Sequence, residues 1–254
     1  MRKIILALYM LGYLPLFTQN VVSKELPVDG NIVLTEGIEI PKVNKGYSVW
    51  LPESGTINGL IVFTHARRDT INRDTLIDYA LKKQLAVFYA TTENRLEFFF
   101  DDNRIQEIEN YINEVVIEYK IPKDNLLYCG MSLEGTRALK LAIYGLSNKS
   151  KHKLKPKAIA ICDAPLDMVR FHKSMIKAKD LNYNAIAANE GKWVSGYLEA
   201  NLGGTPKDNL SAYVDYSPYS YFADTYKDLH YLKNIAFRAY TEPDVEWWIK
   251  TRRK

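Results

Sequence analysis

The chain has 254 residues, of which 47% are hydrophobic and 25% are charged, proportions typical of a folded globular protein with one sizeable domain. Its formal charge is only +4, and the 34 basic residues are spread along the sequence, which argues against a nucleic-acid-binding protein with a dense basic segment. The two cysteines, Cys129 and Cys162, are too few for the disulfide framework of a small secreted domain, so the core must supply the stability.

The N-terminus has the residue order of a secretory signal peptide. Arg2 and Lys3 precede the apolar residues 4–17, and a positive start followed by a short apolar stretch is characteristic of export signals. The stretch is shorter than the roughly 20 residues that a membrane-spanning helix needs, and Pro15 interrupts it, so no stable membrane anchor is expected. We predict a signal peptide over residues 1–23, cleaved before Lys24, and an exported protein that is periplasmic or secreted.

Strand-like and helix-like patterns alternate through the rest of the chain, residues 24–254. Extended stretches come first, at 31–35 and 47–52. Continuous apolar runs, typical of strands buried on both faces, follow at 59–65, 85–90, 125–129, 157–162 and 235–240. Helical spacing of apolar residues occurs at 74–84, 101–119 and 133–144, and a further helix begins near the C-terminus, at 245–250. This alternation predicts an α/β fold, in which a mostly parallel central sheet has helices on both faces.

The turn between the strand at 125–129 and the following helix has the sequence Gly130-Met131-Ser132-Leu133-Glu134-Gly135. It resembles the nucleophile elbow of the α/β-hydrolase superfamily, which contains serine esterases, lipases and peptidases. The resemblance implies that Ser132 is the nucleophile; the alternative is a serine that only caps its helix. Glu134 departs from the motif because a glycine usually stands there, and the next residue, Gly135, supplies the small side chain instead.

The same resemblance implies an oxyanion hole made by two backbone N–H groups. One belongs to Ala66, in the loop after the strand at 59–65, and the other to Leu133, which follows the nucleophile. The pair His65-Ala66 is similar to the His-Gly pair often found at this place. We interpret His65 as a structural histidine that orders the loop.

A catalytic acid is implied after the strand at 235–240, where Asp244 is the first choice and Glu242 the second; capping of the next helix is an equal alternative for Asp244. In this superfamily the histidine base follows the acid in the chain. All four histidines precede Asp244, namely His65, His152, His172 and His230. His172 or His230 could reach the serine, although a surface or core role is the better interpretation of each. We therefore expect a C-terminally truncated chain that lacks the last strand and its histidine.

Residues 166–230 are helical at first and then rich in turns, and we predict that they form a cap insertion over the carboxyl edge of the sheet. Aromatic side chains of this segment either line a substrate pocket or, more simply, pack the cap onto the sheet: Tyr213, Tyr216, Tyr219, Tyr221, Phe222 and Tyr226. The two cysteines end neighbouring strands, which favours a pair of buried thiols over a disulfide.

No cofactor is expected. The loop at 64–69 lacks the glycine-rich turn of a dinucleotide-binding fold, and no histidine or carboxylate pair has the spacing of metal ligands. The predicted function is an exported serine hydrolase that acts on an ester or amide bond of a small-molecule or peptide substrate. The alternative is a truncated, non-catalytic protein that binds a small ligand under its cap.

Overall fold

The computed structural model describes residues 20–33, 39–65, 73–98, 101–224 and 227–241, together with Glu246 and Lys250. The strands are β1 (Val21–Leu26), β2 (Asn31–Val33), β3 (Glu39–Pro41), β4 (Lys45–Trp50), β5 (Gly59–Phe63), β6 (Leu85–Thr91), β7 (Leu126–Met131), β8 (Pro156–Cys162) and β9 (Ala236–Tyr240). The helices are α1 (Thr75–Lys82), α2 (Asp102–Glu118), α3 (Leu133–Leu146), α4 (Met168–Leu181), α5 (Ala185–Leu202), α6 (Leu210–Tyr216) and the 3-10 helix η2 (Lys227–Leu232).

The central sheet has seven strands in the order β1-β4-β6-β5-β7-β8-β9. β4 is antiparallel to both β1 and β6, whereas β5, β6, β7, β8 and β9 are parallel to their neighbours in that part of the sheet. Since parallel strands end at the same edge, the loops after these five strands meet at one edge of the sheet. The predicted α/β class with a mostly parallel sheet is confirmed.

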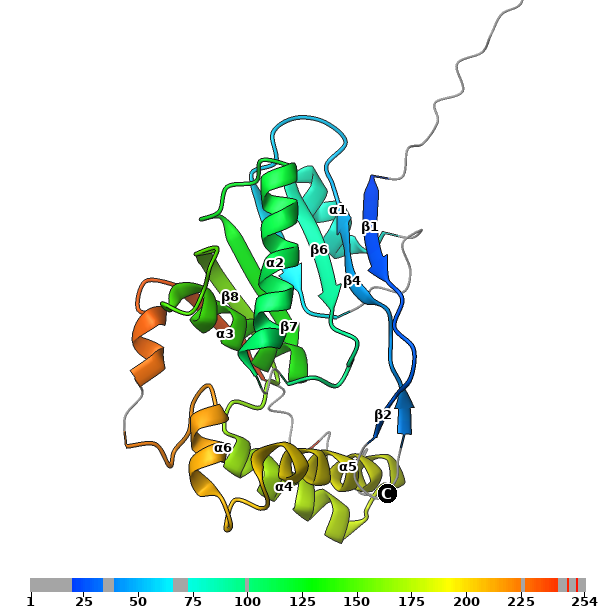
Figure 1. The fold of residues 1–254 in the computed structure, drawn as a ribbon, viewed down its shortest axis with the longest axis vertical. Coiled ribbons are helices and arrows are strands. Elements are labelled where there is room, and N and C mark those ends of the chain that lie inside the picture. Colours follow the sequence, from blue (N-terminus) through cyan, green and yellow to red (C-terminus); the bar gives the residue numbers. More distant parts are fainter. Residues whose placement is uncertain are drawn as a thin grey trace, which may run out of the picture.

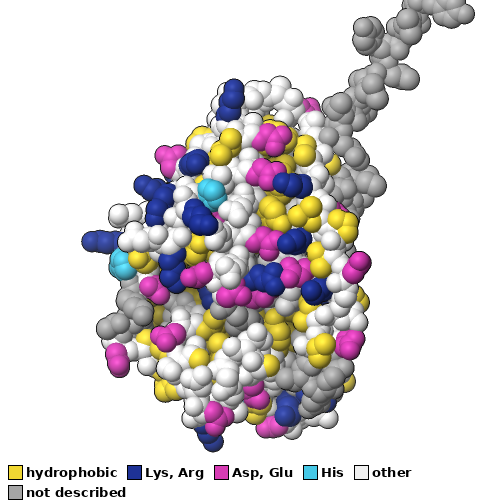
Figure 2. Space-filling model, in the orientation of Figure 1, with side chains coloured by type: hydrophobic (Ala, Val, Ile, Leu, Met, Phe, Trp, Pro, Cys, Tyr) yellow, Lys and Arg dark blue, Asp and Glu magenta, His cyan; other side chains and the backbone are white. Residues whose placement is uncertain are grey.

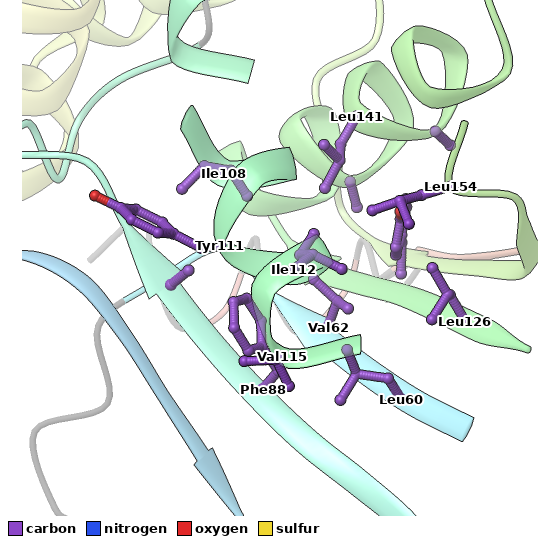
Figure 3. Packing of buried hydrophobic residues seen from close by; sticks show 14 of the residues in the cluster. Leu60, Val62, Phe88, Ile108, Tyr111, Ile112, Val115, Leu126, Leu141 and Leu154 are labelled. Atoms are coloured by element: carbon purple, nitrogen blue, oxygen red, sulfur yellow. The ribbon is translucent and has the colours of Figure 1, made fainter. Parts of the chain in front are cut away.

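Alternate residues of the strands pack into two separate apolar clusters, one on each face of the sheet. Leu60, Val62 and Phe88 face α2, which contributes Ile108, Ile112 and Val115 to the same cluster, as Figure 3 shows. The intervening strand residues join the cluster on the other face, together with buried residues of α1: Trp50, Ile61, Val87 and Tyr89 from the strands, Ile77, Ala80 and Leu81 from the helix. Both faces of β5 and β6 are buried, which is why these inner strands read as continuous apolar runs in the sequence, whereas the edge strand β9 is exposed at all five residues.

The edge strand β1 was not predicted, and it spans the expected signal-peptide cleavage position. Ser23 pairs with Ser48 and Lys24 with Tyr47, and the backbone N–H of Leu51 donates to the carbonyl of Asn20 at 2.7 Å. Cleavage before Lys24 would therefore divide a strand of the sheet. The apolar stretch at 4–17 lies outside the described residues.

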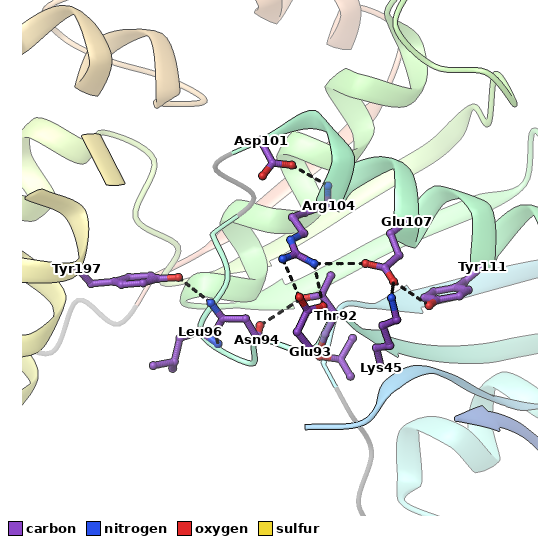
Figure 4. A network of polar contacts seen from close by, with 11 residues as sticks. Lys45, Thr92, Glu93, Asn94, Leu96, Asp101, Arg104, Glu107, Tyr111 and Tyr197 are labelled. Carbon is purple, nitrogen blue, oxygen red and sulfur yellow. Dashed lines mark hydrogen bonds and ion pairs between the residues drawn. The ribbon is translucent and has the colours of Figure 1, made fainter. Parts of the chain in front are cut away.

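Helices α4, α5 and α6 lie in the segment that the sequence assigns to a cap, beyond the ends of the strands (Figure 1). They share an apolar cluster, built around Met168, Leu198 and Tyr213, with residues from the body such as Phe98 and Leu133. A polar network also crosses between cap and body, because Asn94 Nδ2 donates to the hydroxyl of Tyr197 on α5 at 2.8 Å (Figure 4). The short helix α6 stands where the sequence predicted only turns.

The surface in Figure 2 carries Lys and Arg side chains interspersed with Asp and Glu. Among the described helices, none is long and apolar enough to cross a bilayer. The predicted helix at 245–250 falls almost entirely outside the described residues.

Candidate active site

Ser132 lies at the turn between β7 and α3 with an unusual backbone conformation. Its φ is 53° and its ψ is −128°, a sparsely populated positive-φ conformation that costs a residue with a Cβ about 1–3 kcal/mol. Its backbone N–H donates to the carbonyl of Cys162 on β8 at 2.8 Å, which fixes the turn against the neighbouring strand. The side chain is exposed and makes no capping hydrogen bond to α3. Helix capping therefore does not account for this serine, and its hydroxyl is presented at the carboxyl edge of the sheet.

The two glycines of the turn are required by close packing, against backbone atoms for Gly130 and against a side chain for Gly135. A Cβ on Gly130 would lie 2.3 Å from both the carbonyl carbon and the oxygen of Glu134. A Cβ on Gly135 would lie 2.6 Å from the Cβ of Ala164, in the loop after β8. Gly135, in the first turn of α3, thus supplies the small side chain, as the sequence indicated, and Glu134 stands where the motif usually has a glycine.

Glu134 lies beside His65. His65 Nδ1 is 2.9 Å from Glu134 Oε2, an ion-pair distance, although the two groups are not aligned for a hydrogen bond. The imidazole also packs edge-on against Tyr89, with ring centroids 5.2 Å apart, and against Phe63 at 5.7 Å. The register of β5 and β7 explains the contact: Phe63 pairs with Cys129, so the residues that follow on each strand reach the same edge of the sheet side by side.

The buried Arg137, one turn further along α3, fixes the surrounding loops. Its Nη1 donates to the carbonyl of Thr64 at 2.6 Å, its Nη2 to that of Arg95 at 3.0 Å, and its Nε to that of Glu97. Burial lowers the pKa of this guanidinium, yet arginine stays charged in proteins. Three donors in one plane thus hold the loops after β5 and β6 against the elbow helix. Sequence reasoning did not identify Arg137; a single arginine within the apolar stretch of α3 was the available signal.

The predicted oxyanion donors are only partly described. Leu133 is the first residue of α3, so its N–H is one of the amides without an acceptor inside the helix, and its side chain packs against the cap. Ala66 lies outside the described residues. The same holds for Asp244 and Glu242, the predicted acids, which follow β9. A carboxylate that the sequence reasoning missed is Asp163, directly after β8, whose N–H donates to the carbonyl of Tyr240 at 2.9 Å.

The other three histidines have partners away from the elbow. His152 Nε2 lies 2.7 Å from Asn110 Oδ1, and His172 Nε2 lies 2.6 Å from Glu199 Oε1 within the cap. His230 belongs to η2, where its ring lies 4.0 Å from that of Tyr231. Of the four histidines in the chain, His65 is the one beside the elbow, because it contacts Glu134 and because Arg137 binds the carbonyl of the preceding Thr64.

Cys129 and Cys162 are free thiols, as predicted, and both are half-buried rather than fully buried. Burial raises the pKa of Cys129 to about 11, which keeps it protonated. Within the described ranges, no group of three or more histidine, cysteine or carboxylate side chains could hold a metal ion.

Solved structures with a similar fold include an esterase and two peptidases. Carboxyl esterase 2 of the fungus Tuber melanosporum matches 91% of this chain and 69% of its own, with a TM-score of 0.53 and 14% identity. The acylaminoacyl peptidase of Pyrococcus horikoshii matches 87% of this chain and 31% of its own, with a TM-score of 0.51 and 14% identity. A puromycin-hydrolyzing peptidase of Mycobacterium tuberculosis matches 91% of this chain and 32% of its own, with a TM-score of 0.50 and 14% identity.

This chain thus spans about a third of the length of the two peptidases and about two thirds of the esterase. No protein-family model matches the chain, and no curated protein does either. The similarity establishes that the chain has the α/β-hydrolase fold.

Proposed function

We propose that this chain is a serine hydrolase that cleaves an ester or amide bond through an acyl-enzyme on Ser132. The observation that carries the proposal is the conformation of Ser132: a strained, exposed serine between β7 and α3 whose hydroxyl is not used to cap the helix. Strain of this kind persists only where the surrounding structure enforces it, and it concentrates at reactive residues. The N–H groups of Leu133 and Ala66 are the proposed oxyanion donors.

In this proposal His65 is the general base. A serine hydroxyl is a weak nucleophile unless a neighbouring group accepts its proton. Glu134 faces Nδ1 of His65, which leaves Nε2 as the imidazole nitrogen available to Ser132, and the carboxylate would stabilise the imidazolium formed on proton transfer. The glutamate that breaks the elbow motif thereby takes the orienting role that sequence reasoning gave to Asp244.

The test is labelling by a fluorophosphonate probe together with hydrolysis of p-nitrophenyl butyrate. We expect labelling of the chain that is abolished in Ser132→Ala. Because general bases typically contribute 10²–10⁴-fold, His65→Gln should slow labelling at least ~100-fold, and Glu134→Gln should slow it about 10-fold. His152→Gln is the matched control, because this histidine contacts Asn110 on α2, and its rate should stay unchanged.

Each outcome has a defined meaning. A chain that is folded but never labelled would refute the hydrolase proposal and favour the non-catalytic, ligand-binding alternative. Labelling that needs Ser132 but not His65 would leave the hydrolase intact and remove its proposed base. Loss of activity in Asp244→Asn with full activity in Glu134→Gln would assign the orienting role to Asp244.

We also propose that the protein is exported, because Arg2 and Lys3 precede a short apolar stretch. The pairing of β1 with β4 implies that the mature protein begins at or before Asn20, so that the strand is kept. Cell fractionation and N-terminal sequencing of the protein made in a bacterial host test this. An unprocessed chain in the cytoplasmic fraction would overturn the export proposal.

A further inference from the structure

A large groove runs along α4 in the cap. It has a volume of about 1080 Å³, comparable to the largest small-molecule sites of proteins. One face of α4, the loop after α5 and the aromatic pair Tyr221 and Phe222 form its walls. Among the described residues, neither Ser132 nor any other residue of the elbow lines this groove, so it is a site distinct from the proposed catalytic one.

The groove carries four cationic side chains. Arg170, Lys173 and Lys177 recur on α4 at spacings of three and four residues, which places them on one face of the helix, and Lys207 joins them from the loop after α5. All four are exposed, and no carboxylate in the described part of the chain lies within ion-pair distance of them. The acidic residue of the groove, Glu199, is engaged by His172. The groove therefore has an uncompensated positive charge.

Beside these charges lies an exposed apolar surface. The side chains of Tyr221 and Phe222 leave 63% and 52% of their residue surfaces exposed, and Val169 and Ile176 of α4 line the same hollow. The guanidinium of Arg170 lies 4.8 Å from the centroid of the Tyr221 ring, which joins the charged and the apolar parts. Exposed apolar side chains gathered in a concave, charge-rimmed surface are typical of ligand grooves. The neighbouring Tyr213 and Tyr216 are buried in the cap cluster, so the aromatic residues of this segment divide between packing and the groove.

We propose that the groove binds a single-chain anionic amphiphile, a long-chain fatty acid. The alkyl chain lies against Tyr221, Phe222 and the apolar residues of α4, and the carboxylate pairs with the lysines of α4. Charge complementarity requires an anion, and the apolar area gives a hydrocarbon chain its binding free energy. A concave surface disfavours a membrane, which needs a protruding apolar patch. An acidic peptide would find mostly cations and hydrocarbon here, with few partners for its backbone.

The experiment is calorimetric titration of the folded chain with dodecanoate below its micelle concentration. We expect binding that weakens ~100-fold for octanoate, because four buried methylenes are lost. Lys177→Glu should weaken binding about 10-fold or more. Lys179→Glu is the matched control, because Lys179 is also exposed and lies two residues along α4 but does not line the groove, and this variant should bind like the unmodified chain. Phe222→Ser should weaken binding about 10-fold.

Three outcomes would overturn the proposal. The first is equal binding of dodecyltrimethylammonium, which has the same chain and the opposite charge. The second is equal loss in Lys177→Glu and Lys179→Glu. The third is binding to phosphatidylglycerol vesicles or to poly-glutamate in place of dodecanoate, which would indicate a membrane or an acidic protein. The Ser132→Ala variant should bind dodecanoate unchanged, so this result stands or fails separately from the hydrolase proposal.

Discussion

Lys140 on α3 gives the structure an unusual dependence of stability on pH. Its ammonium nitrogen lies 3.3 Å from the centroid of the Tyr216 ring, beside a pocket of about 470 Å³. No carboxylate of the described residues forms an ion pair with it. Burial lowers the pKa of this amine from 10.5 to about 7, and the more distant Glu97 and Asp102 only partly offset the effect.

The sign of the effect follows from proton binding in the two states. Between pH 7 and 10.5 the unfolded chain holds the proton on Lys140 and the folded chain releases it, so the free energy of unfolding rises with pH in this window. Below pH 7 both states are protonated, and the whole destabilisation, on the order of 5 kcal/mol, is present. From pH 7 to pH 9 the unmodified chain should become more stable by about 2 kcal/mol through this group alone.

Lys140→Met removes the titrating group and keeps an unbranched side chain against Tyr216. We expect the variant to be more stable than the parent at pH 7 by about 2 kcal/mol, less than the full penalty because the pocket is open to water and a cation–π contact is lost. Its stability should change little between pH 7 and 9. Urea unfolding followed by tryptophan fluorescence at four pH values from 6 to 9 measures both quantities.

The matched control is Lys149→Met, on the rim of the same pocket. Lys149 Nζ lies 2.9 Å from Asp102 Oδ2, and this hydrogen bond raises its pKa, so its proton is held in both states between pH 7 and 9. The control variant should keep most of the rise in stability of the parent chain, because repulsion by Lys149 makes only the smallest contribution to the lowered pKa of Lys140. A parent chain with no rise, or a Lys140→Met variant that keeps the full rise, would refute the reasoning.

Three further predictions concern the elbow and its supports. Arg137→Met leaves three loop carbonyls without their donor and should lower the free energy of unfolding by roughly 3 kcal/mol or more. Arg137→Lys should recover less than half of this loss. A loss below ~1 kcal/mol for Arg137→Met, measured by urea unfolding, would contradict this role of the arginine. Gly130→Ala should cost about 3 kcal/mol in the same assay, because its Cβ meets backbone atoms that have no freedom to move aside, and an unchanged unfolding midpoint would show that the turn adapts. In a Cys162→Ser chain the remaining thiol, Cys129, should react with Ellman's reagent at pH 8 at least ~10-fold more slowly than after unfolding in urea, and equal rates would rule out the raised pKa of about 11.

The inner parallel strands were predictable because burial on both faces leaves a strong local signal, whereas β9, which was also predicted as a buried run, is exposed at all five residues. β5 and β6 are continuous apolar runs, and α2 carries its buried residues at helical spacing. The edge strand β1 carries no such signal, since five of its six residues are exposed and its Lys24 pairs with Glu114 of α2 at 2.7 Å. β1 is a strand because it pairs with β4, and strand pairing cannot be read from a single sequence. The helix α6 was missed for a related reason. It is short and follows a glycine pair, so its local sequence gives little helical signal, and burial of its tyrosines stabilises it instead.

In the candidate site, too, the features set by neighbouring residues in the sequence were predictable, and the contacts between distant residues were not. The conformation of Ser132 follows from a strand, a small residue and a helix in direct succession, so the motif was sufficient to find it. The contact between His65 and Glu134 joins residues 69 positions apart, a separation given by 134 minus 65, and it exists only because β5 and β7 are neighbours in the sheet. Sequence reasoning treated the two residues as separate irregularities, one a structural histidine and the other a fault in the motif.

The contact between His65 and Glu134 is central to the proposed mechanism. Ser132, Glu134 and Arg137 lie close together in the sequence, so the elbow combines a strained serine, a carboxylate at ion-pair distance from an imidazole and a buried arginine that fixes three carbonyls. The backbone strain of Ser132 costs stability, and under the proposed mechanism this cost is explained because the elbow has to present a reactive hydroxyl. Under the proposed mechanism Glu134 is therefore part of the site, in which base and carboxylate come from the loop after β5 and from α3.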